Sequence, residues 1–367
     1  MKKPVKIKSF YIYLAAIISL LGLLILLTTS KNEPTPYFAK QIKAAEIMEQ
    51  SENYLKQIIV KRGIEIEKED INLTGLIGPE FSPLTTTPGN LEAKRSTLNP
   101  DFAAVLVKYF YESGLKEGDE IAIGTSGSFP GLVIATLSAS KAYGLNAKII
   151  ASYGSSMHGG TRPDFNIIDI ILSLKNQNIV DFNLLAVSPG GANDYGEGVM
   201  EGILYEGTRD MILEKANQTG SLVIDIADLG KNIEKRLSLY GDNIKLFVNI
   251  GGASANCGTS SYTLAFPQGL VLDPPRIPTT DNRGLSYEFA ARGLPVINLL
   301  NVRLLCQENG LPYDPCPLPK IGKSSVYFDR NINIVAIFLL IFTVITILII
   351  GLFNTQKSLQ ERENNEK

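Results

Sequence analysis

The sequence predicts an α/β protein with a doubly wound, mainly parallel sheet, a Rossmann-like three-layer sandwich flanked by two transmembrane helices. The first observation is that short apolar runs alternate with helical patterns from about residue 100 to residue 300. Such βαβ units make right-handed crossovers, which place helices on both faces of a parallel sheet. The second observation is an uncharged apolar run near each end of the chain. The 367 residues suffice for one large α/β domain or about two average domains.

The first apolar run covers residues 10–29, and about 20 residues cross a bilayer as a helix. It follows four lysines, Lys2, Lys3, Lys6 and Lys8, so a signal peptide is the competing interpretation. The run is longer than a usual signal core, and the residues after it lack a small-x-small cleavage site. We therefore expect an uncleaved anchor.

The second apolar run covers residues 332–353 without a charge, which predicts a transmembrane helix. The lysines before the first run predict a cytoplasmic N-terminus, and two spans return the C-terminus to the cytoplasm. We expect a protein of the inner or plasma membrane. The expected organisation is a cytoplasmic N-terminus (1–9), a transmembrane helix (10–29), a helical connector (30–62), an extracytoplasmic α/β domain (63–330), a transmembrane helix (331–353) and a cytoplasmic tail (354–367).

The composition excludes several classes of function. The chain has 35 basic and 37 acidic residues and a net charge of -2, without the basic surplus of a nucleic-acid-binding protein. One histidine and the lack of a C-x-x-C spacing argue against a metal site. There is no G-x-x-x-x-G-K-[ST] motif, and no G-x-G-x-x-G follows the first strand, so we expect no nucleotide or other cofactor.

The three cysteines are Cys257, Cys306 and Cys316. An extracytoplasmic location permits disulfides, and a bridge between the last two would close a short Gly- and Pro-containing loop. Cys257 would then be left buried or reactive. It is a possible nucleophile beside a base, but a buried cysteine in a loop of small residues is the commoner outcome.

Three segments precede the alternating region. Residues 36–62 place apolar side chains at helical intervals, which predicts an amphipathic helix linking the anchor to the domain. Residues 64–71 alternate like an edge strand or a polar connection. Residues 76–90 are rich in Pro, Gly and Thr, so we expect no regular secondary structure there. Such a segment is a linker or a functional loop, and we favour the loop because charged residues follow it.

The alternating region predicts the helices and strands of the sandwich in order. Glycines punctuate the ends of several helices. Helices are expected over residues 102–113, 132–143, 165–174, 199–217, 232–240 and 285–292. Strands are expected over residues 120–123, 147–151, 184–187, 222–226, 245–250 and 296–300.

Four loops of small residues follow predicted strands, at residues 124–131, 152–160, 188–196 and 251–260. Ligands of doubly wound sheets bind outside the carboxyl ends of the strands. Glycine lets backbone N–H groups approach a ligand, and hydroxyl groups add donors. Tight turns also favour small residues, but four such loops together predict one composite polar site. The expected ligand-binding residues are Gly124, Thr125, Gly127, Ser155, Ser156, Gly190, Gly191, Asn193, Gly251, Gly252 and Ser254.

The loop after the first strand is either a nucleophile elbow or an anion-binding turn. Its start matches G-x-S-x-G, but Ser128 stands where the second glycine belongs, so Ser126 and Ser128 are both candidate nucleophiles. His158 is the one possible imidazole base. Asp194 could orient a histidine or act as an acid or base. Asp164 could do the same, although a helix N-cap is its expected role.

The segments 76–95, 124–131, 152–156 and 248–254 together resemble the poly-gamma-glutamate system protein family (PgsW-like). The resemblance covers about residues 40 to 320 and the flanking spans. It implies a membrane system that makes, exports or processes extracellular poly-γ-glutamate, with an anionic polymer and other proteins of a poly-gamma-glutamate synthase complex as partners. It transfers no catalytic residue to this chain.

Three functions follow as expectations. The first is a non-enzymatic, membrane-anchored component whose outward-facing domain binds an anionic polymer; Lys94, Arg95 and Arg162 lie near the predicted loops and could add charge-assisted contacts. The second is an extracytoplasmic serine-type hydrolase or transferase that acts on γ-linked glutamate through Ser126 or Ser128. The third is a sugar-phosphate-binding domain, because the first loop also resembles the phosphate loops of sugar isomerase domains.

Overall fold

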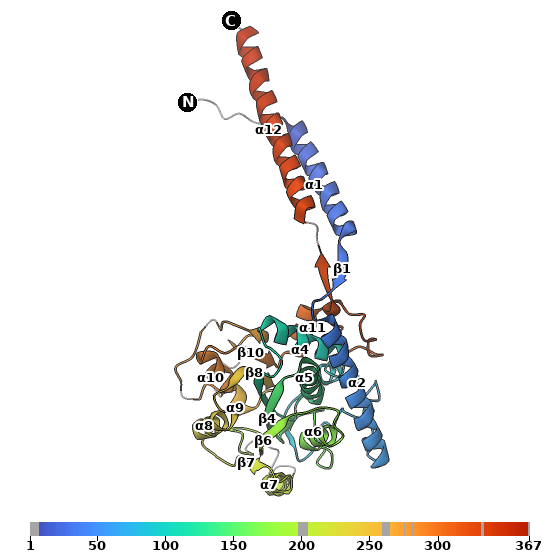
Figure 1. The fold of residues 1–367 in the computed structure, drawn as a ribbon, viewed down its shortest axis with the longest axis vertical. Coiled ribbons are helices and arrows are strands. Elements are labelled where there is room, and N and C mark those ends of the chain that lie inside the picture. The colour runs from blue at the N-terminus through green and yellow to red at the C-terminus, as the bar shows by residue number, and fades with distance from the viewer. Residues whose placement is uncertain are drawn as a thin grey trace. The chain divides into compact units, whose positions relative to one another are not determined.

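A seven-stranded sheet with the order β7-β6-β4-β3-β8-β10-β9 forms the centre of the computed structural model (Figure 1). Neighbouring strands pair in parallel except β9, which runs antiparallel to β10. The expectation of an α/β protein with a mainly parallel sheet is confirmed. The strands are β3 (Glu120–Thr125), β4 (Asn146–Ser152), β6 (Asn183–Ser188), β7 (Leu222–Val223), β8 (Ile244–Ile250), β9 (Gly269–Val271) and β10 (Val296–Leu299). The structure describes residues 7–196, 205–258, 265–274, 276–280, 282–331 and 334–365.

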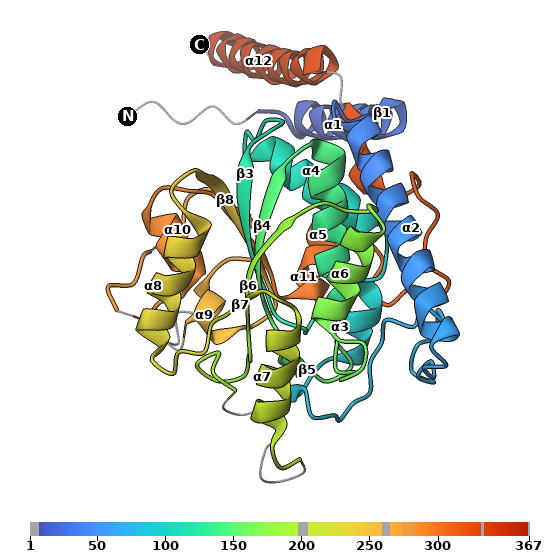
Figure 2. The same cartoon turned by 60° about the horizontal axis from the view of Figure 1, so that its bottom comes forward.

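Helices lie on both sides of this sheet (Figure 2). One side carries α2 (Phe38–Lys61), α4 (Asp101–Glu112), α5 (Pro130–Tyr143) and α6 (Ile167–Asn176). The other side carries α8 (Leu229–Tyr240) and α10 (Leu285–Ala291). Further helices are α3 (Leu91–Ser96), α7 (Thr208–Gln218), α9 (Ser254–Cys257) and α11 (Val302–Asn309).

The core forms on both faces of the central strands. Ile123 of β3 and Val248 of β8 are fully buried, as expected for central parallel strands that helices cover on both sides. On the face of α8 and α10, the rings of Phe247 and Phe289 stack with their centroids 4.8 Å apart. The hydroxyl of Tyr240 donates to the carbonyl of Ile123 at 2.8 Å, so this buried polar group is satisfied.

Helix α5 is buried almost all round because α2 and α4 both pack against it. Its small residues allow this close approach, and Thr136 and Ser140 satisfy their hydroxyls on carbonyls four residues earlier, both at 2.7 Å. Helix α2 is part of the compact unit Pro36–Tyr327. Its buried Gln41 donates to the carbonyl of Val326 at 2.8 Å, which ties the expected connector helix into the α/β unit.

Of the two segments after the connector helix, residues 64–71 follow one of the expected alternatives, whereas residues 76–90 differ from the prediction. Residues 64–71 form turns and a polar connection, without a strand. Residues 76–90 contain a short strand, β2 (Thr85–Thr87), which pairs in parallel with β5 (Ser155–Ser156). The β-branched threonines suit a strand, but their partner lies about 70 residues away, and local patterns carry no such information.

Two helix starts were also misplaced by the sequence pattern. Helix α6 begins at Ile167 and is capped by Asn166 in a capping box with Asp169, so Asp164 does not cap it. Helix α7 begins at Thr208 after Gly207, whose φ of 76° lies in the left-handed region. The expected start at residue 199 lies outside the described residues.

The second compact unit contains the two apolar helices, α1 (Ser9–Thr29) and α12 (Ile334–Asn365). Segments Ser9–Thr28 and Ile334–Ser358 are long and apolar enough to cross a membrane. They pack side by side (Figure 1), and a Cβ on Gly22 would lie only 2.3 Å from Leu340 Cδ1. Strands β1 (Lys31–Pro34) and β11 (Phe328–Asn331) pair antiparallel in the same unit. Helix α12 continues beyond residue 353 into the expected tail.

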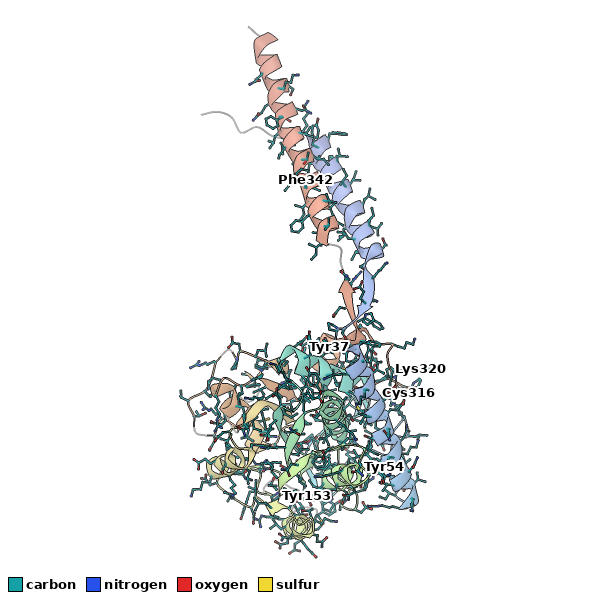
Figure 3. All side chains as sticks on the ribbon, in the orientation of Figure 1. Tyr37, Tyr54, Tyr153, Cys316, Lys320 and Phe342 are labelled. Atoms are coloured by element: carbon teal, nitrogen blue, oxygen red, sulfur yellow. The ribbon has the colours of Figure 1, made fainter. Side chains whose placement is uncertain are left out.

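The three cysteines are all free, so the bridge between Cys306 and Cys316 does not form. Cys306 is buried on α11, whereas Cys316 is exposed on the loop that follows (Figure 3). Burial raises the pKa of the Cys257 thiol to about 11, which opposes a role as a thiolate nucleophile at neutral pH.

Candidate functional site

The strand order reverses between β3 and β8. From β3 the chain runs outward through β4 and β6 to β7, and it then returns to form β8 on the other side of β3. Loops that diverge at such a point leave a crevice at the carboxyl ends of the strands, where α/β proteins bind ligands. A cavity of about 450 Å³ lies there, bounded by the loops after β3, β4, β6 and β8 and by residues 86–90. We call it the strand-end cavity.

All four predicted loops reach the strand-end cavity. The predicted site residues that line it are Ser126, Ser128, Ser156, Gly190, Gly191, Gly252 and Ser254. The predicted site residues that do not line it are Gly124, Thr125, Gly127, Ser155, His158, Asn193, Asp194 and Gly251. Gly124 and Thr125 still belong to β3, and a Cβ on Gly124 would lie 2.5 Å from Asn256 Oδ1, so this glycine packs inside the unit.

Close approach of the loops explains several of their glycines. Gly190 has a φ of 86°, and a Cβ there would lie 2.6 Å from the backbone nitrogen of Gly154. A Cβ on Gly251 would lie 2.6 Å from Ser126 Oγ. The loops after β4 and β6 therefore meet backbone against backbone, and the loop after β8 packs against the side chain of Ser126, so neither contact leaves room for a side chain at the glycine.

His158 is held away from the candidate serines. Its backbone lies in the left-handed region with a φ of 62°, its N–H donates to the carbonyl of Pro79, and its carbonyl accepts from Gly78. Its ring is half-buried and does not line the strand-end cavity. Within the described part of the chain, no hydrogen bond joins this ring to Ser126 or Ser128.

Asp194 forms a buried ion pair with Arg236. Its carboxylate also accepts from the hydroxyl of Ser152 at 2.7 Å, and Arg236 donates to Ser188 Oγ at 2.7 Å. This network joins the ends of β4 and β6 to α8. Asp194 is therefore a structural anchor of two site loops, because its charge is already neutralised inside the unit.

Lys94 enters the strand-end cavity from α3. Asn90 caps this helix by accepting from the N–H of Ala93 at 2.7 Å. Lys94 is only 2% exposed, and its Nζ lies 2.5 Å from Ser156 Oγ and donates to the carbonyl of Ser128. The ammonium also lies 3.8 Å from the centroid of the Phe129 ring. Tertiary folding thus joins a cation to a carbonyl from one loop and a hydroxyl from another.

The electrostatic state of Lys94 is unusual for a lysine. Burial lowers its pKa from 10.5 to about 7, because an ammonium loses its hydration inside the protein. Among the described residues no carboxylate forms an ion pair with it. A buried ammonium with hydroxyl and carbonyl partners alone is suited to an anionic ligand.

The other two cations near the loops are already paired. Arg95 makes a two-point contact with Asp314, with Nε 2.7 Å from Oδ1 and Nη2 2.5 Å from Oδ2. Arg162 donates to the carbonyl of Gly75 at 3.0 Å and to Glu67 at 3.3 Å. Neither lines the strand-end cavity. Of the three cations that the sequence places near the loops, Lys94 is the one that lines the strand-end cavity.

The three cavity serines differ in their contacts. Ser156 offers its hydroxyl to Lys94, and its N–H donates to Ser128 Oγ at 3.1 Å. The N–H of Ser128 in turn approaches Ser126 Oγ at 3.4 Å. The sequence assigned nucleophile roles to Ser126 and Ser128, whereas the serine hydroxyl beside the basic side chain is that of Ser156.

Metal chemistry has no donor set in the described part of the chain, which contains no cluster of three or more His, Cys, Asp or Glu side chains. Comparison with known proteins finds no matching family model, curated protein or solved structure.

Proposed function

We propose that this chain is a membrane-anchored component of an extracellular poly-γ-glutamate system, and that its strand-end cavity binds the free α-carboxylates of this anionic polymer. The observation that carries the proposal is Lys94, a buried cation with hydroxyl and carbonyl partners at the wall of a polar cavity. A bound carboxylate supplies the opposite charge, and such charge-assisted contacts contribute more than neutral hydrogen bonds.

The surroundings of Lys94 support an anion rather than a cation as ligand. Serine hydroxyls donate hydrogen bonds, and the loops at Gly190 and Gly252 bring backbone close to the cavity. No described carboxylate belongs to the lining, so no described side chain there repels a free α-carboxylate of the polymer. The cavity volume of about 450 Å³ suits one or a few residues of a chain.

We infer further that the α/β unit is doubly wound and lies outside the cytoplasm. The reversal of strand order at β3 and β8 is that of doubly wound, Rossmann-like sheets, whose ligands occupy this position. Two spanning helices with a basic N-terminus would hold both termini in the cytoplasm and the unit Pro36–Tyr327 outside. Extracellular polymer would then reach the cavity, together with partner proteins of a synthase complex.

Binding of a synthetic γ-linked glutamate oligomer to the full-length chain in detergent tests this function. We expect Lys94→Met to weaken binding by roughly tenfold to a hundredfold, because a charge-assisted hydrogen bond is lost. Lys108→Met is the matched control, since Lys108 bonds Asn309 at 3.2 Å outside the cavity. An oligomer whose free α-carboxylates are amidated should bind poorly to both variants.

Equal affinity of wild type and Lys94→Met for the carboxylate oligomer would refute the proposed function. Competition by a hexose phosphate at lower concentration than the oligomer would instead favour the sugar-phosphate-binding alternative, which the hydroxyl-rich loop after β3 keeps as the second candidate. Both measurements use the same preparation of the full-length chain.

A further inference from the structure

One pair of side chains in the strand-end cavity is arranged for more than binding. Ser156 Oγ lies 2.5 Å from Lys94 Nζ, on a short strand whose pairing with β2 fixes its backbone. The Ser156 N–H donates to Ser128 Oγ, and the carbonyl of Ser128 accepts from Lys94. Both members of the pair are therefore held in place by a third residue, and both line the cavity.

We propose that Ser156 and Lys94 form a nucleophile and general-base pair that performs acyl transfer on an amide carbonyl of the bound polymer. The γ-glutamyl identity of this amide rests on the proposed function, whereas the chemistry of the pair does not. A nucleophilic hydroxyl within hydrogen-bond distance of a basic side chain is the geometric requirement for such a reaction.

The first half of the reaction forms an ester. The unprotonated Lys94 amine accepts the Ser156 hydroxyl proton while Oγ bonds to the carbonyl carbon, and the carbonyl oxygen becomes an oxyanion. The oxyanion then reforms the carbonyl as the C–N bond breaks, and the leaving nitrogen takes the proton from the Lys94 ammonium. The products are an amine-ended chain fragment and an acyl ester on Ser156.

The second half returns the enzyme to its starting state. A water molecule, or the amine end of another chain, gives a proton to Lys94 and attacks the ester carbonyl. The C–O bond to Ser156 breaks, and Oγ recovers its proton from Lys94. Water yields a shortened chain, and an amine yields a chain attached to a new acceptor.

Two features of the cavity support these steps. Burial lowers the pKa of Lys94 to about 7, so an unprotonated amine is available near neutral pH to accept a proton. Gly252 and Ala253 line the cavity, and their backbone N–H groups have no acceptor among the described residues. Backbone N–H groups of this kind stabilise an oxyanion.

Ser126 and Ser128 lack this arrangement. Ser126 Oγ has a backbone N–H as its neighbour, and Ser128 Oγ accepts from the Ser156 N–H. No described basic side chain lies within hydrogen-bond distance of either hydroxyl, so neither has a group that removes its proton.

Covalent labelling with an uncharged fluorophosphonate tests the pair in the full-length chain in detergent. Attack of the serine oxygen on phosphorus releases fluoride, and peptide mass spectrometry identifies the labelled residue. We expect the adduct on Ser156, with a labelling rate that rises with pH around a midpoint near 7. Ser156→Ala should abolish this adduct, and Lys94→Met should lower the rate at least a hundredfold and remove the pH midpoint. Lys108→Met is the control for loss of a lysine elsewhere.

Circular dichroism of the same samples shows whether each variant is folded, and binding of the γ-linked glutamate oligomer separates the two proposals. An adduct on Ser126 or Ser128 in place of Ser156 would overturn the proposed nucleophile and base pair. A labelling rate in Lys94→Met equal to that of the wild type would also overturn it. The wild-type chain could fail to form an adduct on Ser156 while Ser156→Ala still binds the oligomer as tightly as the wild type. That result would overturn the pair and leave the binding function standing. Labelling of Ser156 without oligomer binding would support the pair and reject the polymer as its substrate.

Discussion

At the scale of single residues, burial of charge decides what the side chains can do. Lys94 keeps a buried amine because hydroxyl, carbonyl and aromatic groups surround it, and these partners lower the cost of burial without supplying a full negative charge. Arg236 shows the alternative, since Asp194 neutralises it and makes it structural. A buried cation without a carboxylate partner, Lys94, is thus available to a ligand, whereas a buried cation with such a partner, Arg236, stabilises the fold.

Glu52 is a second buried ionisable group, and it makes a prediction about stability. It lies on α2, its Oε1 has no hydrogen-bond partner in the described structure, and burial followed by repulsion from Glu49 and Asp70 raises its pKa well above 4.5. The folded chain therefore binds this proton more tightly than the unfolded chain. The contribution of protonated Glu52 to the free energy of unfolding is fully present below the unfolded pKa. This contribution falls as the pH rises from there towards the folded pKa.

Glu52→Gln removes this pH-dependent loss. The variant should be more stable than wild type at pH 7.5, by about 1 kcal/mol or more, and the two should converge near pH 4.5. Thermal unfolding of the α/β unit of the full-length chain at several pH values measures this difference. Glu46→Gln, on an exposed position of the same helix, is the control. A variant that loses stability equally at both pH values would show that Glu52 is charged and paired.

At the scale of elements, the close approach of the loops after β4 and β6 should limit substitution. Gly190→Ala combines a φ of 86° with a Cβ 2.6 Å from the Gly154 nitrogen. Gly220 also has a positive φ, of 66°, but no atom lies within 4 Å of its Cβ position. We expect Gly220→Ala to cost about 1 kcal/mol of backbone strain and Gly190→Ala to cost about 2–4 kcal/mol.

Oligomer binding distinguishes the two alanine variants further. Gly190 lines the strand-end cavity, so Gly190→Ala should also weaken binding, whereas Gly220→Ala should not. Thermal unfolding and calorimetric binding on both variants provide the measurement. Equal destabilisation and equal binding would mean that the loops separate easily and that their contact does not shape the cavity.

The elements that the sequence predicted are those with a local signal. Helix α5 and strand β3 follow from periodicity and an apolar run, and the glycine-rich loops mark where the strands end. The pairing of β2 with β5 has no such signal, because Thr85 and Ser155 meet only through the tertiary fold. Short helices such as α11 carry too few residues to establish a period.

The site also contains some residues with a local sequence signal and some contacts that only the tertiary fold creates. The loop residues Ser128 and Ser156 could be predicted as part of a composite site from strand-end positions alone. The contact between Lys94 and Ser156 spans 62 residues of sequence, so it could not be predicted, although Lys94 lies near the loops in the chain. His158 drew attention as the one histidine, but its backbone is held against Pro79 and its ring stays outside the cavity.

At the scale of the whole molecule, the proposal depends on the side of the membrane that the α/β unit faces. The exposed Cys316 and the buried Cys257 and Cys306 provide a native reporter. On intact cells, a membrane-impermeant maleimide should label the wild-type chain and should not label Cys316→Ser. Labelling that appears only after permeabilisation would place the unit in the cytoplasm and remove extracellular polymer as its ligand.

The pH dependence of γ-linked glutamate binding tests the central claim most directly. A carboxylate ligand favours the charged form of Lys94, whose pKa near 7 means that the charged fraction falls as the pH rises. Affinity of the wild-type chain should therefore fall roughly tenfold between pH 6 and pH 8, opposite to the trend expected for fluorophosphonate labelling. Lys94→Met should bind weakly at both pH values, and Lys108→Met should follow the wild type. An affinity that is independent of pH and unchanged in Lys94→Met would contradict the account.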